Sequence, residues 1–385
     1  MSLNEHPQVI SLYLHIPFCR RKCSYCDFLS YPDQLNKIGD YVNALIIEIK
    51  SYQRWLAGRL ITTVFLGGGT PSLLSPTQVN RIIKTISQTA FLAKDAEITL
   101  EANPEGLSEE RILGYREAGI NRLSIGLQST DPTLLRLLGR HHSVEDYNCA
   151  VVGARRAGIN NINTDLIFGI PGQKIETWQS TLEIVKDLHI PHISCYGLTY
   201  EEGTTFKKNL AKGIMEPADE ELEWSMYRYA IAWLQEQGYE HYEISNYAVP
   251  GNQCRHNLTY WENREYIGLG AGAHGFYHQE RWENYSLIDE YLYRIQNNLQ
   301  PVKSKMRISE AEAVGETMFL GLRLRQGVSE ERFYQRHGNY PDAYFDDKIK
   351  KLVKLKWLKK EDGYIRLTEA GFDLANQVFM EFLAG

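Results

Sequence analysis

The chain has 385 residues, of which 43% are hydrophobic and 23% are charged, and its formal net charge at pH 7 is −6. This composition is ordinary for a globular protein and excludes disordered and fibrous chains. The negative net charge argues against a diffuse basic surface, so no nucleic-acid partner is expected. The length predicts one large domain with a smaller companion, or roughly two to three domains.

The N-terminal stretch, MSLNEHPQVISLYLHIPF, has no basic segment followed by the apolar core of a signal peptide. No later window approaches the roughly 18 uninterrupted apolar residues that span a bilayer. The chain holds six cysteines, which are too sparse for a disulfide-stapled secreted scaffold. These features predict a cytoplasmic protein without a membrane span.

Between residue 11 and about residue 200, short apolar or β-branched runs alternate with longer segments of helical periodicity. This alternation is typical of a parallel sheet with crossover helices, and the continuously apolar runs suit strands buried on both faces. The predicted strands cover residues 11–18, 61–68, 96–103, 122–128, 161–169 and 192–199. The predicted helices cover residues 37–57, 76–90, 108–118, 144–157 and 175–188.

Local signals mark the ends of several of these helices. Ser75 and Ser108 stand where N-terminal caps are expected, and Gly119 and Gly158 follow helices as C-terminal caps. Six β/α units fall two short of a complete eight-stranded barrel. We therefore predict an incomplete, curved, TIM-like (β/α)6 barrel over residues 1–200, with an open doubly wound sheet as the alternative.

The rest of the chain is expected to form two further parts. Residues 201–304 should extend the barrel, with a long helix over 219–237 and a strand over 239–248. Residues 305–385 should form a small, mostly helical, winged-helix-like domain, in which a protein contact is favoured over DNA binding. Its predicted helices cover residues 309–323, 329–336 and 342–356, and the hairpin signal WLKKEDGYIRLT follows them.

Three of the cysteines, Cys19, Cys23 and Cys26, lie within the stretch CRRKCSYC. The stretch is polar, so these thiols are not expected to be core residues. Thiolates bind soft metals, and the C-x3-C-x2-C spacing can wrap one cluster or one ion from a single loop.

The number of available ligands favours a cluster. A structural zinc site uses four ligands, normally in two separated pairs, and no second CxxC occurs. Cys149, Cys195 and Cys254 are scattered singly, and each is expected to be a packed apolar thiol. A [4Fe–4S] cluster on three thiolates would leave one iron open, where chemistry is possible.

Polar motifs follow the C-terminal ends of the predicted strands, on the face where α/β barrels build active sites. The second strand leads into GGGTPS (residues 67–72), whose glycines would let backbone amides approach a bound amino-acid group closely. Glu101 follows the third strand, Gln128 ends the fourth with Arg140 beyond it, and the fifth carries Asp165. Their shared placement indicates one site, although Glu101 and Asp165 could also be satisfied core carboxylates.

The stretch YLHIPFCRRKCSYCDF resembles the signature of the radical S-adenosylmethionine (SAM) superfamily. In that family the methionine part of SAM chelates the open iron, and an electron from the cluster cleaves SAM to a 5′-deoxyadenosyl radical. The resemblance implies that Cys19, Cys23 and Cys26 hold a [4Fe–4S] cluster. It also implies a SAM site lined by Tyr13, Tyr25, Gly68, Gly69, Thr70, Glu101, Gln128, Arg140 and Asp165. In this site Glu101 would accept from the SAM amine, Arg140 would meet its carboxylate and Asp165 would receive ribose hydroxyls.

A narrower resemblance extends over nearly the whole chain. YLHIPFC, GGGTPS, EANPE, GLQS, NTDLIFGIPGQ, YEISNYA and the closing segment are similar to the coproporphyrinogen III dehydrogenase group and, within it, to the HemW heme-chaperone branch. The dehydrogenases carry CxxxCxxCxC, and this chain has Phe28 at the fourth position. They also carry a long N-terminal extension before the first cysteine. Both departures argue against decarboxylation of a porphyrinogen.

Residues 254–261, CRHNLTYW, match the HNxxYW motif of the chaperone branch. A heme iron accepts an imidazole ligand, and aromatic faces pack against the macrocycle. The resemblance therefore implies heme binding by His256, with Cys254, Tyr260 and Trp261 beside it. A histidine next to Tyr and Trp is also often a hydrogen-bonded core residue, and this alternative stays open.

The resemblance implies a chaperone that binds heme and a SAM-chelated cluster and transfers heme to acceptor proteins, such as respiratory enzymes. It would act as a monomer or homodimer, with peripheral association at the membrane. One alternative is an oxygen-independent coproporphyrinogen III dehydrogenase, which would oxidatively decarboxylate propionates with SAM. The others are a radical SAM enzyme for another substrate and a binding module with a purely structural cluster. No residue is assigned a catalytic role.

Overall fold

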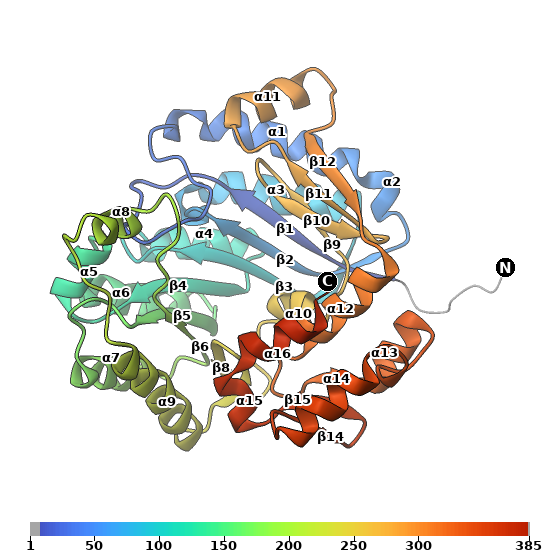
Figure 1. Cartoon of the computed structure of the whole chain (residues 1–385). Coiled ribbons are helices and arrows are strands. Elements are labelled where there is room, and N and C mark those ends of the chain that lie inside the picture. The colour runs from blue at the N-terminus through green and yellow to red at the C-terminus, as the bar shows by residue number, and fades with distance from the viewer. Residues whose placement is uncertain (1–7, 384–385) are drawn as a thin grey trace.

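The structure, a computed structural model, describes residues 8–383 and is built around one large sheet (Figure 1). The N-terminal segment in which no signal peptide is predicted includes residues 1–7, which lie outside the described residues. Six parallel strands follow one another in the sheet in chain order. They are β1 (Val9–Ile16), β2 (Leu60–Gly68), β3 (Phe91–Ala102), β4 (Arg122–Gln128), β5 (Asn161–Phe168) and β6 (His192–Gly197).

The strand order decides between the two predicted architectures. A doubly wound sheet reverses its strand order at a switch point, whereas β1 to β6 run in one direction without a reversal. The sheet also stays open, because β1 continues to β9 on one side and β6 continues to β8 on the other. The predicted incomplete barrel is therefore confirmed.

Helices connect the strands and lie around the outer side of the sheet (Figure 1). The described helices of this part are α1 (Ile38–Ser51), α2 (Gln53–Leu56), α3 (Pro76–Thr89), α4 (Glu109–Glu117), α5 (Pro132–Leu138), α6 (Val144–Arg156) and α7 (Ile175–Asp187), with short 3-10 turns η1 (Leu35–Lys37) and η2 (Pro71–Leu73). The predicted caps are confirmed at Ser75 and Ser108, which accept from backbone N–H groups, and at Gly119 and Gly158, which adopt positive φ.

One predicted helix on this side is wrong in its bounds, and one helix was missed. The single helix expected over residues 37–57 is divided into η1, α1 and α2, because the backbone leaves helical geometry at Tyr52. Helix α5 was not expected at all. Its signals are nevertheless present, since Asp131 caps its N-terminus and Pro132 occupies its first turn.

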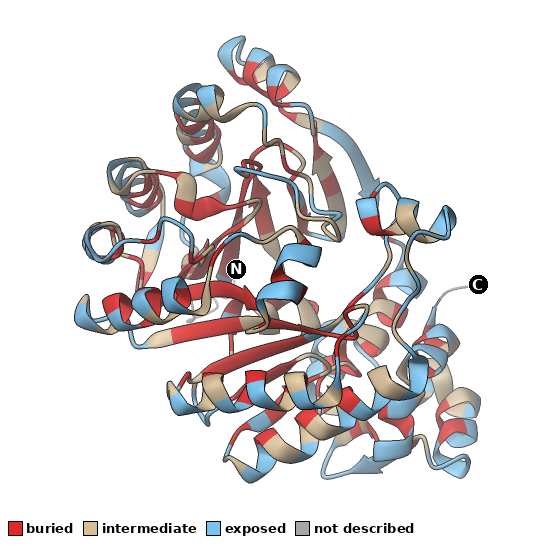
Figure 2. Ribbon diagram, turned by 90° about the vertical axis from the view of Figure 1, so that its left-hand side faces the viewer, coloured by how far each residue is buried: buried red, intermediate tan, exposed pale blue. Residues whose placement is uncertain are grey.

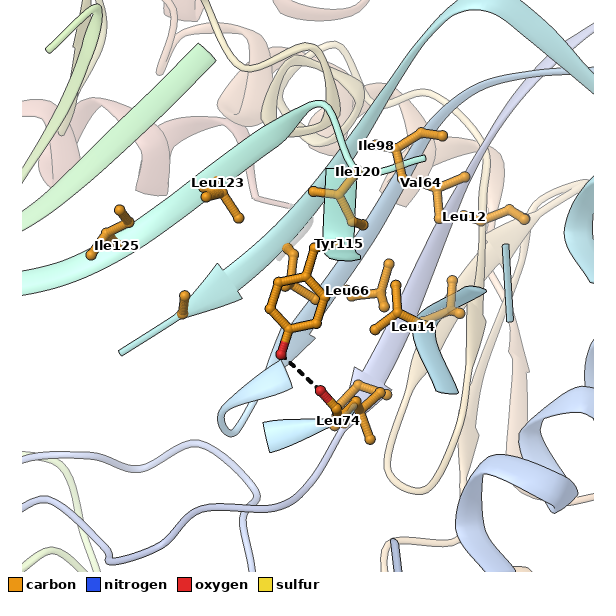
Figure 3. Close-up of a cluster of buried hydrophobic side chains, with 14 of the residues drawn as sticks. Leu12, Leu14, Val64, Leu66, Leu74, Ile98, Tyr115, Ile120, Leu123 and Ile125 are labelled. Carbon is orange, nitrogen blue, oxygen red and sulfur yellow. Dashed lines mark hydrogen bonds between the residues drawn. The ribbon is translucent and has the colours of Figure 1, made fainter. Parts of the chain in front are cut away.

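The two faces of the six strands differ in chemistry. One face carries aliphatic side chains that pack under the helices, and Figure 3 shows Leu12 and Leu14 beside Leu66 in this layer. Tyr115 of α4 closes the layer by donating its hydroxyl to the Leu74 carbonyl at 2.7 Å. Each such aliphatic side chain contributes roughly 1.5–3 kcal/mol when fully buried. The opposite, inner face carries the polar residues Ser11, Tyr13, His15, Thr63, Thr99, Glu101, Arg122, Ser124, Asn163, Asp165, His192 and Ser194.

The middle of the chain extends the sheet at both ends. Strands β7 (Glu240–Glu243) and β8 (Asn246–Ala248) follow β6, and β9 (Tyr266–Leu269), β10 (His274–Tyr277), β11 (Glu280–Asn284) and β12 (Val302–Arg307) follow β1. Its helices are α8 (Thr205–Ala211), α9 (Glu220–Glu236), α10 (Arg255–Trp261) and α11 (Ile288–Gln296). The strand predicted over residues 239–248 is wrong, because the chain turns at residues 244–245 and forms the antiparallel pair of β7 and β8. Strand β12 ends the sheet, and five of its six residues are exposed.

The C-terminal part has its own core of buried side chains, among them Met318, Phe333 and Ile365. A helix, a short strand, two helices and a hairpin follow one another, as predicted for a winged-helix-like domain. The elements are α12 (Glu310–Gly321), β13 (Val328–Ser329), α13 (Glu330–His337), α14 (Asp342–Lys354), β14 (Leu358–Glu361), β15 (Tyr364–Leu367), α15 (Glu369–Asp373) and α16 (Ala375–Phe382).

Burial follows this arrangement, with the central strands buried and the outer helix faces exposed (Figure 2). Among residues 8–383, no helix combines the length and the hydrophobicity that crossing a bilayer requires. The division of the chain at residues 200 and 304 stays a prediction.

Candidate functional site

The cysteine loop (residues 17–34) follows β1 and lies beside the C-terminal end of α5. Cys19, Cys23 and Cys26 are free thiols of intermediate exposure. The Ser24 N–H donates to the Leu138 carbonyl at 3.0 Å, which ties the loop to α5. All three sulfur atoms are thus presented from one loop at the C-terminal edge of the sheet.

His15, on β1, supports this loop from below. Its Nδ1 lies 2.9 Å from the Tyr13 hydroxyl, and its Nε2 lies 3.0 Å from the Leu29 carbonyl. Burial lowers the pKa of His15 to about 4, so the ring is neutral at physiological pH. The neutral ring can therefore accept from Tyr13 and donate to Leu29, which fixes the far end of the loop.

The glycines after β2 allow the chain to approach the cysteine loop closely. Gly68 has φ +109°, and a Cβ there would lie 2.4 Å from the His15 ring. A Cβ at Gly69 would lie 2.5 Å from the Phe18 carbonyl oxygen. The absence of a side chain at both positions therefore lets this turn pack against the protein's own ring and backbone, and the predicted approach of its backbone amides to a bound amino-acid group stays a prediction. Thr70 continues the contact by donating its hydroxyl to the Cys19 sulfur at 3.4 Å.

Arg140 joins the end of α5 to the cysteine loop. Its Nη2 donates to the Tyr25 hydroxyl at 3.0 Å, and its Nη1 donates to the Asn103 side chain. Its Nε is buried and has no hydrogen-bond partner in the structure. A cavity of about 80 Å³ adjoins this guanidinium and is also lined by Cys23 and Thr70. The unpaired donor fits the predicted contact with a ligand carboxylate.

The two predicted carboxylates face the interior of the barrel. Glu101 accepts from the Gly68 N–H at 3.0 Å, and Asp165 accepts from the Ser124 hydroxyl at 3.1 Å and the Asn163 amide at 2.8 Å. Burial and, to a smaller extent, the nearby Asp165 raise the pKa of Glu101 to about 8. Asp165 is therefore well satisfied by its neighbours, whereas Glu101 has a single protein partner.

Gln128 stands at the end of β4 in a conformation that non-glycine residues seldom adopt. Its φ is +68°, and the register between β4 and β5 shifts between Gly126 and Gln128. Such a bulge re-aims a side chain at the end of a strand. Its neighbourhood is shared with Arg140, because a Cβ at Gly126 would meet the side chains of both residues within 3.2 Å.

The HNxxYW segment lies in α10, and its His256 ring stacks on Phe65 of β2 with the ring centres 5.0 Å apart and lies 6.4 Å from the ring centre of Tyr13. His256 is 1% exposed, its Nδ1 lies 2.8 Å from the Thr63 hydroxyl, and its Nε2 lies 2.9 Å from the Tyr260 hydroxyl. A heme iron could reach this ring only if one of those hydroxyls released it. The structure thus places His256 as a hydrogen-bonded interior residue.

The other residues of this segment lie in different surroundings. Cys254 is fully buried, and burial raises the pKa of its thiol to about 12. Trp261 faces the C-terminal part, where the Arg323 guanidinium lies 4.4 Å from its ring centre. The structure therefore does not bring Cys254, His256 and Trp261 together on one open surface.

A buried polar cluster of Glu97 and Arg122 beside the start of α10 was not predicted from the sequence. Glu97 of β3 accepts from the backbone N–H groups of Arg255 and His256, both at 3.0 Å. Arg122 of β4 is 2% exposed. Burial alone would lower the pKa of Arg122, but nearby acidic groups, including Cys254 and Glu97, raise it above its usual value. The alternation of polar residues along β3 and β4 is the signal that identifies them.

We expect His256 to make the stability of the protein depend on pH. Burial and Arg122 lower its pKa to about 3, whereas the unfolded side chain titrates near 6.5. The contribution of neutral, buried His256 to the free energy of unfolding is complete above about pH 6.5. It is lost as the pH falls toward about 3, because His256 binds a proton in the unfolded chain before it does so in the folded protein. Between about pH 6 and about pH 4 this histidine should contribute a slope of about 1.4 kcal/mol per pH unit.

Urea denaturation of His256→Gln and of the unmodified protein at several pH values measures this contribution. The dependence of the unfolding free energy on pH should be less steep in the variant by about 1.4 kcal/mol per pH unit, which corresponds to one proton. Equal slopes in the two proteins would show that His256 does not titrate as its burial requires.

The donor set at the cysteine loop fits a cluster. Within residues 8–383, no three His, Cys, Asp or Glu side chains converge as they would around a single metal ion. This is compatible with a cluster, whose thiolates bind different irons and need not meet at one point. The Thr70 hydroxyl donates a hydrogen bond to the Cys19 sulfur. The Arg140 Nε–H, which has no partner, is a donor that a ligand carboxylate could accept from.

Comparisons with known proteins agree with these features. Residues 13–185 match the model of the radical SAM superfamily, and residues 308–374 match the HemN C-terminal domain. The heme chaperone HemW of Lactococcus lactis is 35% identical over 97% of each chain, and that of Bacillus subtilis is 36% identical over 97% of this chain and 99% of its own. Coproporphyrinogen III oxidase (HemN) from Escherichia coli has a solved structure with a TM-score of 0.85, at 23% identity over 98% of this chain and 91% of the other. This last likeness shows the fold alone. The chain belongs to the radical SAM superfamily and, within it, to the HemW family.

Proposed function

We propose that this chain is a heme chaperone, which binds heme and transfers it to acceptor proteins. The observation that carries this proposal is its identity of 35% and 36%, over nearly the full length, to two proteins named heme chaperone. Phe28 in the cysteine loop also supports the proposal, because the dehydrogenases carry a fourth cysteine at this position and this chain does not.

The same proposal includes a [4Fe–4S] cluster and SAM. Cys19, Cys23 and Cys26 would hold the cluster, and Thr70 would donate to the Cys19 sulfur. When bound, the cluster would supply an open iron, which the amine and carboxylate of SAM would chelate, and a source of one electron. Arg140, which keeps an unpaired Nε–H, would orient the SAM carboxylate, and Glu101 would accept from its amine. Tyr13, Tyr25, Gly68, Gly69, Gln128 and Asp165 would complete the SAM site.

The place of action and the acceptors form the finer part of the proposal. Free thiols across the described residues suit the reducing cytoplasm. We propose that the acceptors are respiratory enzymes, which the chain meets as a monomer or homodimer at the membrane surface. No nucleic-acid partner is included.

Hemin titration beside an anaerobic turnover assay tests the proposal. The purified protein should develop a Soret band on titration with hemin and should pass the heme to a heme-free b-type cytochrome. Reconstituted protein with SAM and coproporphyrinogen III should give no protoporphyrinogen. A protein without affinity for hemin would contradict the proposal. Formation of protoporphyrinogen with stoichiometric 5′-deoxyadenosine would favour the dehydrogenase instead.

A further inference from the structure

Asn103 was not predicted as a site residue, but it contacts two residues that were, Thr70 and Arg140. It follows the last residue of β3 and precedes Pro104. The residue before a proline is held in extended backbone conformations, so the origin of the Asn103 side chain is fixed. This side chain lines the cavity of about 80 Å³ that Cys23 and Arg140 also line.

The two ends of the Asn103 amide have different partners. Its oxygen accepts from Nη1 of Arg140, and its nitrogen donates to the Thr70 hydroxyl at 3.4 Å. These partners fix which end is the oxygen, because a guanidinium can only donate. Asn103 therefore joins Arg140 to Thr70 through one planar group.

Arg140 is held through both of its terminal nitrogens. Nη1 donates to Asn103, and Nη2 donates to the Tyr25 hydroxyl at 3.0 Å. The guanidinium is rigid and planar, so two fixed contacts also set the direction of its third donor. That donor is the buried Nε–H, which has no partner in the structure. Asn103 thus fixes the direction of a donor that is free for a ligand carboxylate.

Thr70 carries the contact from Asn103 to the cysteine loop. Its backbone N–H donates to the Phe18 carbonyl at 2.7 Å, and its side chain is buried. Its hydroxyl has a single hydrogen, which it donates to the Cys19 sulfur at 3.4 Å. Because the same oxygen accepts from Asn103, this hydrogen points away from the amide and toward the sulfur.

A hydrogen bond of this kind changes the redox chemistry of a cluster. Hydrogen bonds to the cluster sulfurs stabilise the reduced form, which carries one more negative charge than the oxidised form. The hydrogen bond from Thr70 would therefore make a cluster bound at Cys19 easier to reduce.

We propose that Asn103 is a positioning residue with two effects. Through Arg140 it orients the donor to the SAM carboxylate, and through Thr70 it directs a hydrogen bond to the Cys19 thiolate. The proposal rests on the proposed [4Fe–4S] cluster and SAM site and is independent of heme binding. Asn103 itself binds neither group.

Two measurements on the reconstituted protein test this assignment. Equilibrium dialysis gives the affinity for SAM, and an EPR-monitored titration without SAM gives the midpoint potential of the cluster. Asn103→Leu keeps the approximate shape of the side chain and removes both polar atoms. It should bind SAM about tenfold more weakly. Its cluster should be about twofold to tenfold harder to reduce, or ~20–60 mV at ~59 mV per tenfold for one electron.

Asn43 of α1 provides the matched control. Its side-chain oxygen also accepts from an arginine, Nη2 of Arg81 at 2.8 Å, but it is exposed and lies outside the cysteine loop. Asn43→Leu should match the unmodified protein in both SAM affinity and potential. A residue with a purely structural role at position 103 would leave the potential unchanged.

Thr70→Val tests the path from Asn103 to the cluster. This variant has no hydroxyl, so its potential should fall by at least as much as that of Asn103→Leu. The variant with both substitutions should have the same potential as Thr70→Val alone, because Asn103 acts on Cys19 only through that hydroxyl. An unchanged potential in Thr70→Val would overturn this path even if Asn103→Leu does not fold.

The outcomes separate the assignment from the proposed function. If the unmodified protein assembles no [4Fe–4S] cluster, or its cluster does not bind SAM, that part of the proposed function fails and the assignment of Asn103 fails with it. If the unmodified protein does both, and Asn103→Leu keeps its SAM affinity and its potential, the cluster and the SAM site stand and the assignment is overturned.

Discussion

Replacing Cys23 with serine should leave the protein folded but without its brown colour, its iron or its affinity for SAM. The loop that carries Cys23 lies at the edge of the sheet, outside the aliphatic layer that stabilises the barrel. The free energy of unfolding of the metal-free protein should therefore change by less than about 1 kcal/mol. SAM affinity should fall about a hundredfold, or about 2.8 kcal/mol, because chelation to the open iron is lost.

Iron analysis, equilibrium dialysis with SAM and urea denaturation measure the three quantities. Cys149→Ser is the matched control, since Cys149 is exposed on α6 and distant in sequence from the loop. The control should retain its iron and SAM binding. If Cys23→Ser instead unfolds while Cys149→Ser does not, the cluster has a structural role, as in the binding-module alternative.

Replacing Glu97 with alanine should lower the free energy of unfolding by about 3–5 kcal/mol. Two backbone N–H groups at the start of α10 would lose their acceptor. The buried guanidinium of Arg122 would also lose a nearby negative charge. Leaving a buried charge and buried donors without partners costs more than the removal of most surface contacts.

Asp95 offers a control on the same strand. Its side chain is 80% exposed and forms an ion pair with Arg255 at 3.2 Å, so Asp95→Ala should change the free energy of unfolding by less than about 1 kcal/mol. Glu97→Gln keeps one carbonyl acceptor but removes the charge. Its loss in free energy of unfolding should be intermediate between those of Glu97→Ala and Asp95→Ala. Urea denaturation at neutral pH measures all three. A loss below about 1 kcal/mol for Glu97→Ala would mean that α10 does not depend on this carboxylate.

The parallel strands and most of their helices were predictable because the signals are local. Short apolar runs between helical segments located the ends of β1 to β6 within five residues, and serine and glycine marked helix ends. The division at Tyr52 and the turn at residues 244–245 depend on backbone geometry rather than on a change in composition. The attachment of β9 beside β1 was not predictable, because it joins segments far apart in the chain.

The cluster and SAM part of the candidate site was predictable from the sequence, whereas the surroundings of His256 were not. The cysteine loop and the polar residues at strand ends stand out by type and spacing, and the structure brings Tyr25, Thr70 and Arg140 close to the cysteines. The burial of His256 was not evident, because a sequence does not show which side of α10 faces the barrel.

The open sheet leaves strand β12 with a free hydrogen-bonding edge, where another chain could add a strand. Long exposed edges of this kind promote fibre formation in many proteins. Here Lys303, Lys305 and Arg307 alternate along the edge. A second copy aligned against it would bring like charges together, so the protein can keep twelve strands unclosed and still resist self-assembly into filaments.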